Sequence, residues 1–217
     1  MSEYYIPTGP GEAEFTEKRS RFLGHVRMVE TEDEARAFIA EIKKKYYDAR
    51  HNCWCYSIRN GPERYSDDGE PQGSAGIPML EVLRRQGLTN CVCVVTRYFG
   101  GVLLGTGGLL RAYTRSAADA LQAAGISVVR RWVETELPCT YAQMERMKQE
   151  AAAAGGIVAD VEYGADVTLK VLVPEEQSEG FADRIFDQSA GSVTVKVTAL
   201  GSGVETADDM AGMTCAM

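Results

Sequence analysis

The chain has 217 residues, of which 45% are hydrophobic and 25% are charged, and its net charge is −8. These values are typical of a globular protein and exclude a disordered or low-complexity chain. No apolar run approaches the roughly 20 residues that cross a bilayer. The first residues, MSEYYIPTGPGEAEF, lack the basic and apolar regions of a signal peptide, so we expect a cytoplasmic protein that does not attach to membranes.

The first elements in the chain alternate between strand and helix patterns. A strand-like stretch over 14–29 is expected to bend or pair on itself around 18–20. The helix that follows begins at a capping box of Thr31 and Glu34. Its apolar residues recur with a period of 3.6, at Ala35, Phe38, Ile39, Ile42 and Tyr46. The lysines at 43–45 fall in its last turn, where the helix dipole favours cations, which explains them without nucleic acid.

The rest of the first half is expected to contain two strands, a long loop and two helices. The strands cover 51–59 and 91–98, and the loop covers 60–76 because Gly and Pro stand at turn positions. A short helix begins near Pro78, packs through Leu80 and Leu83, and ends at Gly87. A longer helix covers about 107–124, and its expected buried residues are Leu109, Leu110, Tyr113, Ala117, Leu121 and Ala124.

Two C-x-C pairs, Cys53/Cys55 and Cys91/Cys93, raise the question of a metal site or disulfides. Zinc ligands are usually spaced as C-x₂₋₄-C across a turn, whereas these pairs lie inside strand-like runs. Residues i and i+2 of a strand share one face, so we interpret each pair as two small buried residues. No metal, cofactor or disulfide is expected.

The second half is expected to form a separate domain over 132–200, after a first domain over 1–131. Four strands and two helices follow the order β-α-β-β-α-β, the ferredoxin-like arrangement, which makes the fold class α+β. Alternation predicts one buried face, with Val133, Leu137, Ile157, Val161, Val167, Leu169, Val171, Val193, Val195 and Val197. The opposite face is acidic and hydroxylic without aromatics, which argues against RNA bases stacking there. The remaining 201–217 are expected to be a mobile tail.

Charge is divided unevenly between the halves. Residues 1–131 contain 18 Lys and Arg against 16 Asp and Glu, a net charge of +2, whereas residues 132–217 contain 5 against 15, a net charge of −10. A polyanion is therefore expected to contact the first half, because the second would repel it.

The segment RYFGGVLLGTGGLLRAY, residues 97–113, is rich in glycine and is flanked by Arg97 and Arg111. Backbone N–H groups before a helix can bind a phosphate-type anion, and the arginines can add charged hydrogen bonds. The spacing matches neither a Walker A loop nor a dinucleotide motif. Glycines also permit positive φ and close packing of a helix on a sheet. Packing and ligand binding both stay open.

Asp67, Asp68 and Glu70 form a carboxylate cluster on the expected loop. They can hold a hard cation, cap the helix near Ile77, or pair with an arginine of the glycine-rich segment. No nucleophile stands beside a base in a recognisable pattern. His25 and His51 are the two histidines, and a lone strand histidine is typical of a structural hydrogen bond. No catalytic residue is therefore assigned.

Three segments together resemble the IMPACT/YigZ family: DARHNCWCY, YSDDGEPQGSAGIPMLEVL and VVTRYFGGVLLGTGGLLRAYTRSAADAL. The resemblance covers roughly residues 13–125 and implies a first domain like domain IV of elongation factor G, with a left-handed βαβ crossover. It also implies that the second domain resembles domain V of that factor. Eukaryotic members of the family regulate translation by binding a partner that activates a stress kinase, and nucleic-acid or ribosome association is expected of bacterial members.

The resemblance also implies a functional surface. Its residues are Asp67, Asp68, Gly69, Glu70, Pro71, Gly73, Arg97, Tyr98, Gly100, Gly101, Gly105, Gly107, Gly108 and Arg111. The first hypothesis is a translation-linked binding protein that contacts RNA, the ribosome or a protein partner. The second is an enzyme acting on a phosphorylated small molecule or nucleotide. In a third, the charged residues only hold the loops together. All three require the acidic turn and the arginine-flanked segment to meet in space.

Overall fold

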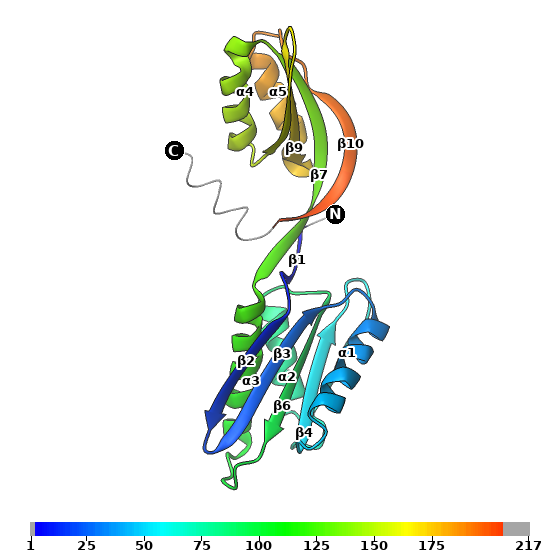
Figure 1. Ribbon diagram of the computed structural model, residues 1–217, viewed down its shortest axis with the longest axis vertical. Helices are drawn as coiled ribbons and strands as arrows, with labels where there is room; N and C mark the ends of the chain where they lie inside the picture. Colours follow the sequence, from blue (N-terminus) through cyan, green and yellow to red (C-terminus); the bar gives the residue numbers. More distant parts are fainter. Residues whose placement is uncertain (1–2, 206–217) are drawn as a thin grey trace. The chain divides into compact units, whose positions relative to one another are not determined.

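The computed structural model describes residues 3–205 (Figure 1). Within them the chain divides into a first unit, Tyr4–Val128, and a second unit made of Glu3 and residues 129–205. The sequence analysis placed the boundary after residue 131. No helix within 3–205 is long and apolar enough to cross a bilayer.

The first unit is built on an antiparallel sheet in the order β2-β3-β6-β4-β5. Its strands are β2 (Gly11–Glu17), β3 (Ser20–Met28), β4 (His51–Ser57), β5 (Glu63–Ser66) and β6 (Cys91–Tyr98). The expected turn at 18–20 is confirmed, since β2 pairs with β3 and the turn residues Lys18 and Arg19 have φ of 45° and 66°. β3 and β4 both run antiparallel to β6, which lies between them, so the β3-α1-β4 connection crosses over β6.

Helices cover both faces of this sheet. On one face α1 (Glu32–Lys45) buries Phe38 and Ile42 against Val92 and Val94, and its expected cap is confirmed by a 3.2 Å bond from the Glu34 amide to Thr31 Oγ1. On the other face α2 (Gly76–Arg85) and α3 (Thr106–Ala124) pack against the alternate residues of β4 and β6. The four C-x-C cysteines are fully buried, as expected from strand alternation: Cys53, Cys55, Cys91 and Cys93.

Two expectations for the first unit are wrong. The loop predicted over 60–76 contains β5, which pairs with β4 through its backbone. Leu110 was expected on the buried side of α3 but is 45% exposed, because it points away from the apolar stripe that begins at Leu109.

The close approach of α3 to the sheet depends on glycines that the motif search did not single out. A β-carbon on Gly11 would lie 2.1 Å from the carbonyl oxygen of Ala120, and one on Gly24 would lie 2.5 Å from that of Ser116. The hairpin β2-β3 therefore contacts the α3 backbone directly. A β-carbon on Gly105 would meet nothing within 4 Å and one on Gly107 only the Arg111 side chain, so packing against the sheet does not explain these two glycines.

The second unit has the expected β-α-β-β-α-β order. Its elements are β7 (Ile126–Cys139), α4 (Tyr141–Ala153), β8 (Ile157–Tyr163), β9 (Val167–Pro174), the 3₁₀ turn η1 (Glu175–Gln177), α5 (Ser178–Gln188) and β10 (Lys196–Glu205). In the sheet β7 pairs with β9 and β9 with β8, while β10 pairs with β7. The short strand β1 (Tyr4–Pro7) belongs to the first unit. Leu137, Leu169 and Val171 are buried against Phe181 and Ile185 of α5. The fold class is α+β.

The last strand differs from its prediction. It begins at Lys196, so that Val193 and Val195, predicted on its buried face, precede it, and Val197, predicted on the same face, is 62% exposed. Residues 201–205, assigned to the tail, belong to β10, and 206–217 lie outside the described residues. On the open face Lys170 pairs with Glu162 at 2.5 Å and with Asp160 at 3.6 Å, so that face is charged as expected.

Candidate functional site

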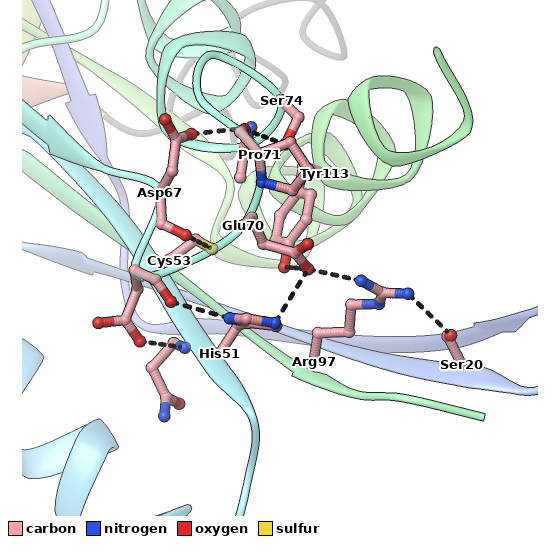
Figure 2. Close-up of polar contacts among 12 residues, drawn as sticks. Ser20, His51, Cys53, Asp67, Glu70, Pro71, Ser74, Arg97 and Tyr113 are labelled. Atoms are coloured by element: carbon pink, nitrogen blue, oxygen red, sulfur yellow. Dashed lines mark hydrogen bonds and ion pairs between the residues drawn. The ribbon is translucent and has the colours of Figure 1, made fainter. Parts of the chain in front are cut away.

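The acidic turn and the end of β6 meet at one end of the first unit (Figure 2). Glu70 Oε1 accepts a 2.6 Å bond from Arg97 Nη1 and a 2.8 Å bond from the Tyr113 hydroxyl of α3. Arg97 Nη2 also donates to Ser20 Oγ at 3.3 Å. Because His51 pairs with Arg97 across β4 and β6, its ring lies beside the same carboxylate. The expected spatial juxtaposition of the two segments is confirmed through Arg97.

Asp67 and Asp68 hold the turn in place. Asp67 Oδ2 accepts from the Gly73 amide, and Asp67 Oδ1 accepts from the amides of Ala75 and Gly76, so this carboxylate caps α2. Asp68 accepts from Lys43 Nζ at 2.6 Å and from a β4 amide at 2.7 Å. Both carboxylates are occupied by protein donors: the expected helix cap describes Asp67, whereas Asp68 pairs with Lys43 of α1 and not with an arginine of the glycine-rich segment.

His51 is a site residue that the sequence analysis did not assign. Its Nδ1 lies 2.8 Å from the carbonyl oxygen of Asp68. A carbonyl only accepts, so Nδ1 carries the proton, and Nε2 faces Glu70 Oε1 at 4.0 Å. The signal that pointed here was the motif DARHNCWCY, where His51 follows Arg50.

A cavity of about 400 Å³ opens above the Glu70–Arg97 pair, and we call it the Glu70 cavity. Its polar residues are Arg50, His51, Glu70, Arg97 and Thr106. Its other lining residues are Gly69, Pro71, Phe99, Leu103, Leu104, Gly105 and Leu109. The cavity therefore has an ionic floor, apolar walls and the N-terminus of α3 at its edge.

Arg97 is a deeply buried cation of this cavity. Its side chain is 6% exposed, and its guanidinium carbon lies 5.6 Å and 5.5 Å from the ring centroids of Phe22 and Phe99. Its Nε has no hydrogen-bond partner among the residues that the structure describes. An arginine held by Glu70 and two rings keeps one geometry, which makes the floor rigid.

Arg111 does not join Glu70. It lines a neighbouring pocket of about 160 Å³, which we call the Lys18 pocket. Lys18 and Arg115 also line it, together with Phe15, Glu17, Leu104, Gly108 and Ala112. Of the two arginines that were possible partners of the acidic turn, Arg97 pairs with it and Arg111 does not, because Arg111 lines this pocket beside the β2-β3 turn. Leu104 contributes to both pockets, so they are neighbours.

The remaining expected site residues have separate positions. Gly69, Pro71 and Gly105 line the Glu70 cavity, and Gly108 lines the Lys18 pocket. Gly107 lies in the first turn of α3, where a β-carbon would be 3.7 Å from Arg111 Nη1. Tyr98 lines neither pocket, and its hydroxyl donates to Asp48 Oδ1 at 2.8 Å.

Gly100 and Gly101 are adjacent but are constrained differently. A β-carbon on Gly100 would lie 2.0 Å from the Arg19 backbone, whereas Gly101 has φ of 83° and open space around it. Gly100→Ala is expected to lower the free energy of unfolding by about 1–3 kcal/mol or more, because backbone must move. Gly101→Ala is expected to cost about 1 kcal/mol, the strain of a left-handed residue. Thermal unfolding of both variants tests this order, and equal losses would contradict it.

Two neighbouring groups with nucleophilic atoms, a tyrosine hydroxyl and a cysteine thiol, are held neutral. Burial raises the pKa of the Tyr113 hydroxyl far above its usual range, so the hydroxyl stays protonated and donates to Glu70. Burial also raises the pKa of the Cys53 thiol, whose Sγ–H donates to the Asp67 carbonyl at 3.0 Å. Within 3–205 no cluster of three His, Cys, Asp or Glu side chains is arranged to hold a metal ion.

The fold and the site define a class: a two-domain α+β protein whose first domain ends in a pocket formed by the DDGEP turn, the end of β6 and the glycine-rich start of α3. Residues 18–121 match the family model for the Impact N-terminal domain, and residues 137–192 match that for a domain of unknown function, DUF1949. The chain belongs to the IMPACT family.

Similar proteins cover nearly the whole chain. IMPACT family member YvyE of Bacillus subtilis is 34% identical, over 90% of this chain and 91% of that protein. YigZ of Escherichia coli is 33% identical, over 89% of this chain and 97% of that protein. A crystal structure titled as a hypothetical protein superposes with a TM-score of 0.57 at 32% identity, and covers 92% of this chain and 98% of that one.

Proposed function

We propose that this chain is a cytoplasmic, translation-linked binding protein whose N-terminal domain binds RNA, free or within the ribosome. The observation that carries the proposal is a group of cations without carboxylate partners around the two pockets. Its members are Lys18, Arg19, Arg50 and Arg111, and none of them forms an ion pair with another described residue.

These cations gather at one end of the sheet. Lys18 and Arg19 form the β2-β3 turn, and the next residue, Ser20, accepts from the Gly100 amide after β6. Arg50 immediately precedes β4, whose first residue pairs with Arg97 near the end of β6. Phosphate groups are bound by exposed cations of this kind, and the contact releases counterions from the nucleic acid.

Other arginines of the same domain are already neutralised. Arg21 pairs with Glu14, Arg27 with Glu41, and Arg84 with both Glu63 and Glu81. The net charge of the first half is only +2, but part of its negative charge is paired with these arginines away from the two pockets. The end of the sheet that carries the pockets is therefore more positive than the net charge of the whole half indicates. In the second half the net charge of −10 disfavours a polyanion, which directs the proposal to the first domain.

The test is salt-dependent binding of ribosomal RNA fragments to the full chain. Arg111→Gln is expected to weaken binding several-fold at low salt and to reduce the slope of log K against log[salt] by about 1. Arg85→Gln, at the last turn of α2, removes the same charge away from the pockets and is expected to leave binding unchanged. Absence of binding at low salt, or equal losses in the two variants, would overturn the proposal.

An enzyme acting on a phosphorylated small molecule is supported by one observation, because a cavity of about 400 Å³ has the size of a small-molecule site. The three carboxylates of the acidic turn would be the metal ligands of such an enzyme, and their contacts weigh against this second function. Asp67 accepts from three amides, Asp68 from Lys43, and Glu70 from Arg97. Binding is therefore the function that the geometry supports better.

A further inference from the structure

Three polar groups in the Glu70 cavity have unused hydrogen-bonding capacity. Both strong bonds to Glu70 end on Oε1, and Oε2 has no partner among the described residues. His51 donates through Nδ1, and its Nε2, which lies 4.0 Å from Glu70 Oε1, has no hydrogen-bond partner among the described residues. Arg97 Nε is a buried donor without a partner. Unpartnered polar groups in a cavity indicate a ligand that completes them.

The chemistry of these groups restricts that ligand. A carboxylate oxygen only accepts, so the ligand must present an N–H group to Glu70. The walls formed by Pro71, Phe99 and Leu109 are apolar and suit a flat ring. A nucleobase with an exocyclic amino group fits both requirements, since glutamate accepts from such amino groups in known recognition of bases.

Uracil lacks this complementarity. It carries carbonyl oxygens where adenine and cytosine carry an amino group, and a carbonyl beside Glu70 Oε2 would place two acceptors in contact. The cavity therefore distinguishes bases by a repulsive contact as well as an attractive one.

The Lys18 pocket supplies the second half of a nucleotide site. It shares Leu104 with the Glu70 cavity, and three cations line it: Lys18, Arg111 and Arg115. Arg115 is partly engaged by Asp119 at 3.3 Å, whereas Lys18 and Arg111 have no acidic partner among the described residues. Glu17 also lines the pocket, but the three cations outnumber it, and a volume of about 160 Å³ suits a phosphate and is small for a base.

We propose that the Glu70 cavity binds one unstacked nucleobase carrying an exocyclic amino group, while the Lys18 pocket binds a phosphate of the same nucleotide or strand. This inference rests on the proposed RNA binding and narrows it to single strands, because a base inside a duplex cannot enter a cavity. A free mononucleotide presents the same chemistry, and the experiment separates the two sources.

The experiment measures fluorescence anisotropy of the full chain with short labelled homopolymers of adenylate, cytidylate and uridylate. Adenylate and cytidylate strands are expected to bind about tenfold more tightly than uridylate. Phe99→Ala removes a cavity wall and is expected to weaken adenylate and cytidylate binding about tenfold while uridylate binding changes little. Phe186→Ala, which removes a half-exposed ring in α5, is the matched control and is expected to change none of them.

The outcomes separate the inference from the proposed function. Equal affinity for the three strands, or equal loss for all three in Phe99→Ala, overturns the base cavity and leaves RNA binding in place. Absence of binding to any strand overturns both. Phe99 is 40% exposed, so its removal leaves the fold intact, and a thermal unfolding curve checks this.

Competition by free nucleotides identifies the source of the base. Displacement of the adenylate strand by AMP but not by UMP supports the cavity and shows that a mononucleotide fills it. Failure of both to compete, together with a preference for adenylate strands, supports a site that requires the phosphates of a strand. Equal displacement by AMP and UMP overturns the base selectivity.

Discussion

Arg97→Ala is expected to lower the free energy of unfolding by about 3–5 kcal/mol, the cost of leaving a buried charge without its partner. Arg97 and Glu70 are 6% and 3% exposed at the side chain, and their atoms lie 2.6 Å apart. With Arg97 removed, the Glu70 carboxylate keeps only the neutral Tyr113 hydroxyl as a close donor. Denaturant unfolding measures the loss, and hydrogen exchange of β6 assigns it to the first unit.

The double variant Glu70→Ala with Arg97→Ala provides the control. It is expected to cost much less than the sum of the two single changes, because neither charge is then left alone. Tyr113→Phe removes one hydrogen bond from the same carboxylate and is expected to cost about 1 kcal/mol. Additive losses in the double variant would show that Glu70 and Arg97 are not energetically coupled. That result would contradict a rigid ion pair at the base of the Glu70 cavity.

The second large effect is expected at Asp67. Its carboxylate accepts from three backbone amides, those of Gly73, Ala75 and Gly76, at 2.8 to 3.0 Å. Asp67→Ala leaves these amides without acceptors and uncaps α2, so we expect a loss of about 3 kcal/mol or more in the free energy of unfolding.

Two further variants define the cause. Asp67→Asn keeps one acceptor oxygen, which can bind either the Gly73 amide or the amides of Ala75 and Gly76. It is therefore expected to lower the free energy of unfolding by about half as much as Asp67→Ala. Asp33→Ala removes an exposed carboxylate from the first turn of α1 and is expected to cost under about 0.5 kcal/mol. Thermal unfolding of the three variants gives the order, and a loss at Asp67 no larger than at Asp33 would contradict the capping role.

Local sequence rules predicted the elements whose signals are local. The N-cap at Thr31, the hairpin turn at 18–20 and the buried cysteine pairs each depend on residues within a few positions of one another, and the structure confirms them. The second bond of the expected capping box is not formed, since the Glu34 carboxylate accepts from the Glu30 amide instead. β5 was missed because its stability comes from pairing with β4, while its own segment is rich in turn-forming residues. Leu110 was misplaced because a helical period leaves residues at the edge of a stripe undecided.

The sequence by itself determined the fold class, the order of the elements other than β1 and β5, and the family, since these follow from periodicity, caps and long motifs. It also named the turn and the arginine that form the site. Only the tertiary structure decided which charges meet: Arg97 reaches Glu70 across 27 positions of the chain, whereas Arg111 faces Lys18. His51 was not predicted as a site residue for the same reason, because its position beside Glu70 depends on the pairing of β4 with β6. Side-chain pairing over such separations depends on strand register and helix rotation, and local composition does not fix either of them.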